Sequence, residues 1–518
     1  MVHKDYMIDA ASSELMKLAR ATGAIYLSSI LVLFLGFISV IMVVRFTTQS
    51  EYGTYSLATT IMSIIVLVSS LGLIEGVARY IAYFRGTEET NKIRDIIASS
   101  VQIALISGSV FLVLSFLIAP IISNYIFQNP ELLTPFRLLA ITIPFSVLIN
   151  IYVSIFRGFD KIMPSACFSL MKSLIFLILL MAYFLYGPSL DVAIIANIFS
   201  VLGTCIVFSI YFKKRLPLAM VSWGLVKIRP ICFDLLSFSI PLLAVNMLMS
   251  VLTWTDTLMI GYFKTPQLVG LYNVAPPLAY LNMLFLTSLG TLYVPIASKL
   301  YSQNKLDDLK KIYSTSTKWC FIATFPLACI FILLPQVVLD LFYGPRYIGA
   351  APVLQIMTLG IILSTISGPS FYALIAIGKT GIISRGYVIG SIINIALNAV
   401  LIQHMGITGA AVASALSIAI VSIILSIGLY RLTGMHPLTR EYTKIIAASL
   451  IAGAFVYVIS QNRSCDGAIE LAGTFILVTL IYAALIVIAK GFDQEDLMLI
   501  RKARELLNSG LSSLRRVK

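Results

Sequence analysis

Long apolar runs separated by short polar connectors fill almost the whole chain. Lipid offers backbone N–H and C=O groups no hydrogen-bond partners, so a run that crosses a membrane must be a helix of about 20 apolar residues. Short connectors, such as GPSL after Tyr186 and QHMG after Ile402, leave room only for a tight reversal between antiparallel helices. We predict spans at 21–46, 52–83, 97–121, 132–156, 162–186, 189–212, 235–262, 268–298, 314–335, 350–377, 382–402, 406–431, 444–460 and 468–489.

The pattern contains an internal repeat. The segment FTTQSEYGTYSLA (46–58) aligns without a gap to FKTPQLVGLYNVA (263–275) at a constant offset of 217 residues. At an offset of 220, FRGFDK around Gly158 aligns with AIGKTG around Gly378. We therefore predict an all-α polytopic membrane protein with about fourteen transmembrane helices, arranged as two six-helix lobes related by pseudo-twofold symmetry plus two C-terminal helices. In transporters built from such repeats, the substrate site lies near the bilayer midplane between the halves.

The repeat also sets the predicted boundaries of the parts. They are a cytoplasmic amphipathic segment (1–20), an N-lobe (21–212), a cytoplasmic linker (213–234), a C-lobe (235–431), spans thirteen and fourteen (444–489) and a cytoplasmic amphipathic tail (490–518). Composition agrees with a membrane protein, because 59% of the residues are hydrophobic and only 12% are charged. Soluble globular domains have about a quarter of their residues charged.

Basic residues indicate the orientation of the chain. The net charge is +14, but Lys and Arg form short clusters between apolar runs instead of one basic surface for nucleic acid. With the N-terminus in the cytoplasm, 30 of the 37 basic residues fall in inner segments and four fall in outer loops. Positive charge is retained on the cytoplasmic side, so both termini are predicted to be cytoplasmic.

Two charged residues lie in the second span. A charge in a span costs about 2.5–3.5 kcal/mol on insertion scales, so it is expected to face a cavity or a partner. Glu75 and Arg79 are four residues apart, hence on one helix face where they can pair. Gly72 and Gly76 permit a close approach of another helix to that face. Arg79 is a candidate donor to an anionic headgroup and Glu75 a group that tunes it; a structural ion pair is the alternative.

Three more basic residues lie within or beside apolar runs. Arg45 and Arg137 are near outer helix ends, where the side chains can reach the interface. This explanation does not apply to Lys172, which is well inside the fifth span. If these groups line one cavity together with Arg79, that cavity is cationic and suited to a pyrophosphate or a sugar acid.

Candidate cation ligands lie in the second half of the chain. Asp256 has no Lys or Arg within two helical turns in the sequence, which predicts a carboxyl group that is protonated or binds a cation. The offset of 217 places Ser39 at the matching position of the first half, so the halves differ there. Asn394 and Asn398, one turn apart, can bind a hard cation such as Na⁺ through their amide oxygens, or can join two helices by hydrogen bonds.

Motifs for nucleotide hydrolysis and metalloprotease chemistry are missing from the sequence. It contains no GxxxxGK[ST] loop, no HExxH and no serine nucleophile elbow. We therefore predict a transporter and not an enzyme, without a cofactor other than H⁺ or Na⁺ as a coupling ion.

Several of these segments resemble lipid-linked oligosaccharide flippases. EYGTYSLATTIMSIIVLVSSLGLIEGVARYIAYF is similar to their second span, and SFSIPLLAVNMLMSVLTWTDTLMIGYFKTPQLVGLYNVAPPLAYL to their seventh and eighth spans. LDLFYGPRYIGAAPVLQIM is similar to their outer loop before the tenth span, and NIALNAVLIQHMGITGAAVASALS to the eleventh and twelfth. The resemblance is to the polysaccharide transport (Wzx-type) branch of the multidrug/oligosaccharidyl-lipid/polysaccharide exporter superfamily.

The resemblance implies a fold, a site and a location. Two six-helix lobes would enclose a cationic cavity with alternating access driven by a proton or sodium gradient, in the plasma membrane of a prokaryote. The sodium ligands of such relatives lie on the seventh, eleventh and twelfth spans, where this chain has Asp256, Asn394 and Asn398, with Thr408, Ser414 and Ser417 as weaker candidates. The group expected to engage an isoprenoid phosphate- or pyrophosphate-linked oligosaccharide comprises Arg79, Lys172, Arg45, Arg137 and Glu75.

Implied partners are the lipid-linked oligosaccharide, membrane lipids and glycan polymerases or transferases, with the protein a monomer and no nucleic acid bound. A drug/cation antiporter of the same superfamily is the alternative, although it requires more cavity acids than Glu75 and Asp256. A membrane glycosyltransferase and a scaffold protein are disfavoured. The first requires an acidic pair or a large outer loop, and the second has no use for charges in the membrane.

Overall fold

The computed structural model describes residues 28–491 except 29, 186, 188, 216–230, 438, 463–466 and 490. These residues form helices and turns, and none of them is in a strand. The chain divides into two compact units, Met1–Asn273 and Val274–Lys518. The predicted N-terminal segment, most of the predicted linker and nearly all of the predicted tail lie outside the described residues.

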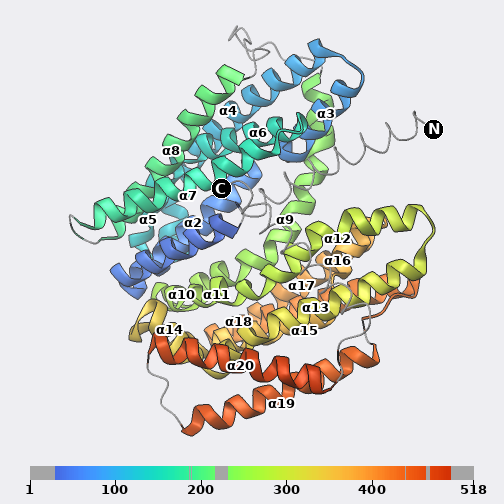
Figure 1. Ribbon diagram of the computed structural model, residues 1–518. Coiled ribbons are helices and arrows are strands. Elements are labelled where there is room, and N and C mark those ends of the chain that lie inside the picture. The colour runs from blue at the N-terminus through green and yellow to red at the C-terminus, as the bar shows by residue number, and fades with distance from the viewer. Residues whose placement is uncertain are drawn as a thin grey trace, which may run out of the picture. The chain divides into compact units, whose positions relative to one another are not determined.

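The first unit is a set of packed helices and helical turns (Figure 1). In chain order they are Ile30–Phe46, α2 (Gln49–Ser69), α3 (Leu73–Gly86), α4 (Thr90–Pro120), η1 (Ile121–Ile126), η2 (Pro130–Leu132), α5 (Leu133–Ala140), α6 (Ile143–Gly158), α7 (Ile162–Phe184), α8 (Leu190–Arg215), α9 (Ile231–Phe263) and α10 (Pro266–Asn273).

The described residues of the second unit likewise form helices joined by turns and short loops. It contains α11 (Ala275–Tyr280), η4 (Leu281–Met283), α12 (Leu284–Ser302), α13 (Leu306–Leu333), α14 (Pro335–Tyr343), η5 (Pro345–Ala350), α15 (Ala351–Ile366), α16 (Ser370–Ala376), α17 (Thr380–Met405), α18 (Ile407–Thr433), α19 (Arg440–Asn462) and α20 (Ala468–Ile488). The last two helices pack on α13, where Phe321 meets Tyr442 edge to face.

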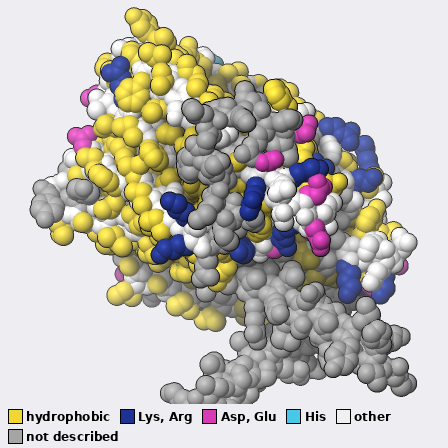
Figure 2. All heavy atoms as spheres, turned by 90° about the horizontal axis from the view of Figure 1, so that it is seen from above, with side chains coloured by type: hydrophobic (Ala, Val, Ile, Leu, Met, Phe, Trp, Pro, Cys, Tyr) yellow, Lys and Arg dark blue, Asp and Glu magenta, His cyan; other side chains and the backbone are white. Residues whose placement is uncertain are grey.

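The helical membrane class is confirmed. Eleven described helical segments are long and apolar enough to span a membrane, and the bent pair Pro130–Ala140 and Ile143–Gly158 adds a twelfth if it is one span. Two shorter apolar helices, Ile30–Phe46 and Cys167–Ala182, lie where the first and fifth spans are predicted. The count of fourteen stays a prediction. Hydrophobic side chains cover much of the surface in Figure 2, as lipid-facing helices require.

The compact units and the predicted lobes divide the chain at different places. The repeat assigns the seventh and eighth spans to the C-lobe, whereas α9 and α10 pack against helices of the first unit, with α2 a neighbour of both. A sequence repeat indicates that a segment was duplicated, whereas a compact unit is defined by which helices pack together. The compact units therefore do not test the predicted lobes. The lobe boundaries therefore stay a prediction.

Two of the predicted spans are interrupted. The second span breaks between α2 and α3, where Leu71 and Gly72 have φ angles of +50° and +69°. The left-handed region costs a non-glycine residue about 1–2 kcal/mol, so packing must hold Leu71 there. The fourth span bends by 45° between α5 and α6, where Pro144 lies in the first turn of α6. Proline removes a backbone donor and suits such a restart.

Local sequence explains where the two copies of the repeat begin their helices. Thr48 and Glu51 form a capping box at the start of α2, in which each side chain accepts a hydrogen bond from the other residue's backbone N–H. In the second copy, α10 begins at Pro266, a residue favoured at the first helical position because its missing N–H would have no acceptor there.

These two helices make a reciprocal contact, which we call the glycine junction (Gln49, Gly53, Pro266 and Gly270). A Cβ atom at Gly53 would lie 1.8 Å from the Pro266 carbonyl oxygen, and one at Gly270 would lie 2.0 Å from the Gln49 carbonyl oxygen. Both glycines and both carbonyl groups are separated by the repeat offset of 217 residues. Each copy therefore gives the other the same contact, and only glycine permits it. Beside it, Gln267 Nε2 donates to Gln49 Oε1 over 3.0 Å.

Candidate functional site

The charged pair of the second span lies where α3 crosses α9. A Cβ atom at Gly72 would lie 2.0 Å from the Ser239 carbonyl oxygen, and one at Gly76 would lie 2.1 Å from the Ser239 hydroxyl oxygen. The close approach predicted from these two glycines is thus confirmed.

Glu75 and Arg79 are exposed and take partners on α9 instead of each other. Asn246 Nδ2 donates a long hydrogen bond of 3.4 Å to Glu75 Oε2. The guanidinium carbon of Arg79 lies 4.0 Å from the centroid of the Phe238 ring. In the described part of the chain no ion pair joins Glu75 to Arg79, so the pairing that their spacing allows is not made. A guanidinium stacked on a ring keeps its N–H edge available to an anion.

The other three basic candidates lie on separate helices of the first unit. Arg45 is at the end of the helix Ile30–Phe46 and Lys172 is on α7, and both are exposed. Arg137 on α5 is only partly exposed, and its Nε is buried without a hydrogen-bond acceptor among the described residues. A common cavity for these residues and Arg79 stays a prediction.

Asp256 lies in a polar cluster between α9 and α10, which we call the Asp256 cluster (Asp256, Thr257, Tyr272 and Asn273). The Asp256 side chain is on a residue only 3% exposed, and the Tyr272 hydroxyl donates a hydrogen bond to its Oδ2. The adjacent Thr257 hydroxyl donates to Asn273 Oδ1 over 2.9 Å. A buried ionised carboxylate is costly unless hydrogen bonds or a countercharge compensate it. The cluster supplies part of that compensation and ties the last turn of α10 to α9.

The opposite side of α10 is held by α2. The Tyr52 hydroxyl donates to the Asn273 carbonyl oxygen over 3.4 Å, and the glycine junction brings the two backbones together. Figure 1 shows α2 and α10 as neighbours. The hydroxyl that meets Asp256 is therefore carried by a helix that is fixed on two sides.

The first copy of the repeat has a different arrangement at the corresponding positions. Ser39, the counterpart of Asp256, donates to the Leu35 carbonyl oxygen over 2.8 Å. Tyr55, the counterpart of Tyr272, accepts a hydrogen bond of 3.2 Å from Asn197 Nδ2. The repeated tyrosine thus meets an amide in one copy and a carboxylate in the other, in line with the predicted inequality of the halves.

The asparagine pair belongs to the second unit, whereas Asp256 belongs to the first. Asn394 and Asn398 are fully buried on α17. Asn394 Nδ2 donates to Ser414 Oγ on α18 and Asn398 Nδ2 donates to Asn394 Oδ1, both over 3.2 Å. The first bond joins α17 to α18, which is the second of the two roles expected from the sequence, and the other lies within α17. A cation at this pair stays a prediction.

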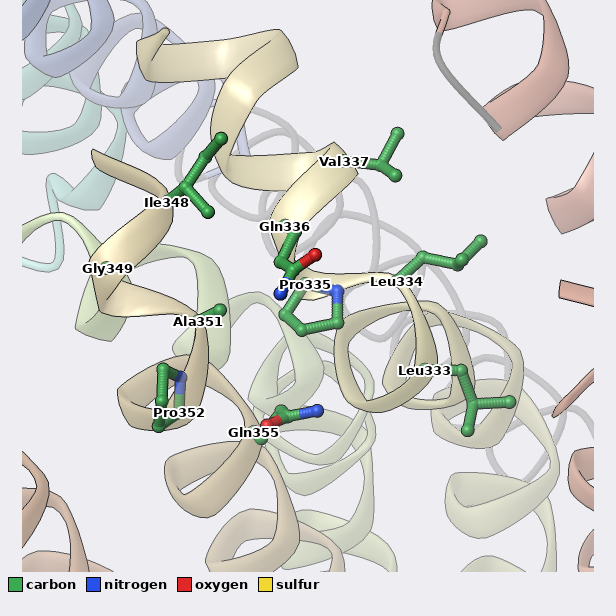
Figure 3. A pocket seen from close by; sticks show the side chains of 10 residues that line it. All are labelled: Leu333, Leu334, Pro335, Gln336, Val337, Ile348, Gly349, Ala351, Pro352 and Gln355. Carbon is green, nitrogen blue, oxygen red and sulfur yellow. The ribbon is translucent and has the colours of Figure 1, made fainter. Parts of the chain in front are cut away.

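A pocket of about 500 Å³ lies elsewhere in the second unit, at the N-terminal ends of α14 and α15 (Figure 3). Its lining is mainly apolar, with the amide side chains of Gln336 and Gln355. Gln355 Nε2 donates a hydrogen bond to the Ile332 carbonyl oxygen over 2.7 Å. None of the predicted site residues lines this pocket.

Two residues at these places, Tyr272 and Phe238, and the buried Lys318 of α13 are absent from the sequence-based candidates. Tyr272 lies in the repeated motif, where its coincidence with Tyr55 is a usable signal. Phe238 gives no signal, because an aromatic residue in an apolar run is unremarkable. The charge count places Lys318 in a cytoplasmic segment, yet it is only 2% exposed on α13. Its position inside the predicted ninth span, 314–335, points to that burial.

Known proteins share this fold and parts of this sequence. An uncharacterized membrane protein of Methanocaldococcus jannaschii is 24% identical over 70% of this chain and 74% of its own. A probable low-salt glycan biosynthesis flippase of Haloferax volcanii is 29% identical over 32% of this chain and 36% of its own. The solved structure of the lipid II flippase MurJ in an inward closed conformation matches with a TM-score of 0.72 at 19% identity, covering 93% of this chain and 100% of that one.

Two family models match the sequence. The MatE model matches residues 241–400. The model described as polysaccharide biosynthesis protein matches residues 18–301, which is more than half of the chain. The chain therefore belongs to the polysaccharide biosynthesis protein family, within the multidrug/oligosaccharidyl-lipid/polysaccharide exporter superfamily that its sequence resembles.

Proposed function

We propose that this protein translocates an isoprenoid phosphate- or pyrophosphate-linked oligosaccharide from the cytoplasmic to the outer leaflet by alternating access. Family membership supports a role in polysaccharide biosynthesis, and the relative in Haloferax volcanii is named as a probable glycan biosynthesis flippase. The observation that carries the proposal is Arg79, an exposed guanidinium within an apolar span, stacked on Phe238.

Arg79 has the chemistry to bind a phosphate group. The planar guanidinium donates two parallel hydrogen bonds to phosphate oxygens, and stacking on an aromatic ring restricts its orientation without using those donors. It lies seven residues, about 10 Å, before the end of α3 at Gly86. In the proposed orientation this end is cytoplasmic, so a headgroup that enters from the inner leaflet reaches Arg79 first. Glu75, one turn further on, repels the same anion and favours its departure.

We assign coupling to Asp256. A buried carboxylate that accepts a hydrogen bond from a hydroxyl group fits a proton or Na⁺, because a hard cation prefers oxygen ligands. A carrier with alternating access requires only that its two states bind the cation and the substrate with different affinities. Cation binding by Asn394 and Asn398, which belong to the second unit, stays a separate prediction. A monomeric state and glycan polymerases or transferases as partners stay predictions.

A drug/cation antiporter is the second candidate, favoured by the MatE match over residues 241–400. A cationic drug requires acidic groups at its binding surface, whereas Arg79 presents an exposed guanidinium on α3 and Lys172 is an exposed basic residue on α7. The charge of these helices thus favours an anionic substrate. Export of a cationic dye by the purified protein, without movement of lipid-linked glycan, would reverse this order.

Arg79→Ala is expected to lower the translocation rate by roughly tenfold at limiting substrate, because a hydrogen bond to a charged group contributes about 1.5–3 kcal/mol. In cells that lack their own flippase, lipid-linked glycan reaching the outer leaflet is quantified by mass spectrometry after labelling with an impermeant reagent. The wild-type chain restores transfer and Arg79→Lys restores it in part.

Arg85→Ala is the matched control on the same helix. Arg85 pairs with Asp160 at 2.8 Å on the exposed surface, with its side chain 42% exposed, and exposed ion pairs contribute little. Full activity of Arg79→Ala, at wild-type protein levels, would refute the phosphate role. Failure of the wild-type chain to restore transfer would refute the proposed function.

The proposed topology is tested through Cys465, which lies in a predicted outer loop and outside the described residues. In a variant whose other five cysteines are serine, an impermeant maleimide is expected to label Cys465 in intact cells. A second variant that keeps only Cys232, at the start of α9, is expected to react only after the membrane is opened. The reverse labelling pattern would invert the orientation and place both termini outside.

A further inference from the structure

We propose that the Tyr272 hydroxyl stabilises the cation-free carboxylate of Asp256 and thereby sets how readily the site releases its cation. The ligand class is a small monovalent cation, for which Na⁺ is the probe. This inference rests on the coupling role proposed for Asp256, and it assigns the release step to a residue of the repeated motif.

Burial raises the free energy of the cation-free, ionised state of Asp256. Asp256 is 3% exposed and Tyr272 is 1% exposed, so water does not solvate the carboxylate at this contact. The Tyr272 hydroxyl donates to Asp256 Oδ2, which is the polarity that favours the ionised acid. In an apolar setting a carboxylate binds its cation too strongly to release it, unless a hydrogen-bond donor stabilises the ionised carboxylate after the cation has left. Tyr272 is such a donor.

The backbone of Tyr272 is held in place, so its hydroxyl does not have to move to reach Asp256. Its neighbour Asn273 accepts from the Thr257 hydroxyl over 2.9 Å and from the Tyr52 hydroxyl over 3.4 Å, so both α9 and α2 hold the end of α10. The glycine junction fixes the start of the same helix. A donor fixed in this way stabilises the geometry in which it already meets the carboxylate, at no cost of reorganisation.

A cation at Asp256 weakens this hydrogen bond. It neutralises carboxylate charge and competes for the lone pairs that accept the hydroxyl proton, so the bond contributes more to the cation-free state than to the bound state. This difference in hydrogen-bond free energy between the two states makes the binding of the cation weaker by the same amount. Removing the hydroxyl is therefore expected to tighten binding by roughly tenfold, as expected for one hydrogen bond to a charged group.

The repeat supplies a matched control. Tyr55 corresponds to Tyr272 at the offset of 217 residues, but its hydroxyl accepts from the Asn197 amide and meets no carboxylate among the described residues. Tyr55→Phe removes the same hydroxyl from the same motif position. It is expected to leave cation affinity unchanged.

The experiment is a Na⁺ titration of the purified full chain in lipid nanodiscs, with choline keeping the ionic strength constant. Trp254, two residues from Asp256, reports binding by its fluorescence when the other two tryptophans, Trp223 and Trp319, are phenylalanine. Tyr272→Phe is expected to lower the half-saturating Na⁺ concentration by roughly tenfold and to slow Na⁺ release on dilution. Asp256→Asn is expected to abolish the response.

Each outcome decides a separate point. Unchanged affinity in Tyr272→Phe overturns the inference, and weaker affinity overturns it by making the hydroxyl a cation ligand. If Tyr272→Phe is not monodisperse, 3-fluorotyrosine at position 272 keeps the side chain and strengthens the donor, so the half-saturating concentration is expected to rise. A wild-type chain without a Na⁺ response, or a response that persists in Asp256→Asn, overturns the premise at Asp256. Glycan translocation is measured independently of all these outcomes.

Discussion

Asp256→Asn is expected to reduce the maximal rate of glycan translocation by roughly tenfold or more, because coupling between a gradient and a carrier typically changes affinities by about 5- to 150-fold. Asparagine has the shape of aspartate and still accepts the Tyr272 hydrogen bond, so α9 and α10 stay packed. It carries no charge to exchange for a cation. Initial rates in proteoliposomes, with and without an imposed cation gradient, measure the effect: the gradient accelerates the wild-type chain only.

Asp234→Asn provides the control on the same helix. Asp234 is exposed in the first turn of α9, outside the Asp256 cluster, and its exchange is expected to leave the gradient response intact. If Asp256→Asn retains the gradient response at wild-type protein levels, coupling belongs to another group and the assignment of Asp256 fails.

Gly270→Ala is expected to give a large loss of stability, because it breaks the glycine junction. The added Cβ would lie 2.0 Å from the Gln49 carbonyl oxygen, and backbone atoms cannot rotate away as a side chain does. α2 and α10 must therefore separate, at a cost of about 1–3 kcal/mol or more. Thermal unfolding in detergent, followed by size-exclusion chromatography with fluorescence detection, measures the shift.

Gly473→Ala is the control with the opposite expected sign. An added Cβ at Gly473 meets no atom within 4 Å, and alanine is favoured over glycine in a helix by about 1 kcal/mol. In the double variant Gly53→Ala/Gly270→Ala, the loss is expected to be smaller than the sum of the single losses, because the first substitution already separates the helices. Additive losses, or a stable Gly270→Ala, would show that the junction does not hold α10.

The helices could be predicted because the membrane leaves the chain few alternatives. Apolar length, charge asymmetry and close-packing glycines are local properties, and the approach of α9 to Gly72 and Gly76 follows from them. The break at Leu71 could not be predicted in this way. It is set by a left-handed backbone at a leucine, in a run that reads as continuous helix.

The sequence predicted which residues belong to the candidate site, but it did not predict which residues they contact. Spacing along one helix identifies Glu75 and Arg79 as neighbours, but their observed partners come from a helix about 160–170 residues further on. The same limit applies to Asp256. Its isolation from basic residues is visible in the sequence, whereas the hydroxyl that meets it arrives across the reversal between α9 and α10. Contacts of this kind depend on tertiary packing, which periodicity does not encode.

The glycine junction has a consequence for the origin of the chain's duplicated plan. Two equal contacts that are exchanged by one sequence offset are the pattern of an isologous interface, in which a surface is complementary to itself. A polypeptide that carries a single copy of the motif would present both the glycine and the carbonyl group, and two such polypeptides could pair about a twofold axis. Fusing the copies into one chain releases them from identity, so that one of them can acquire an acid at Asp256 while its counterpart keeps Ser39.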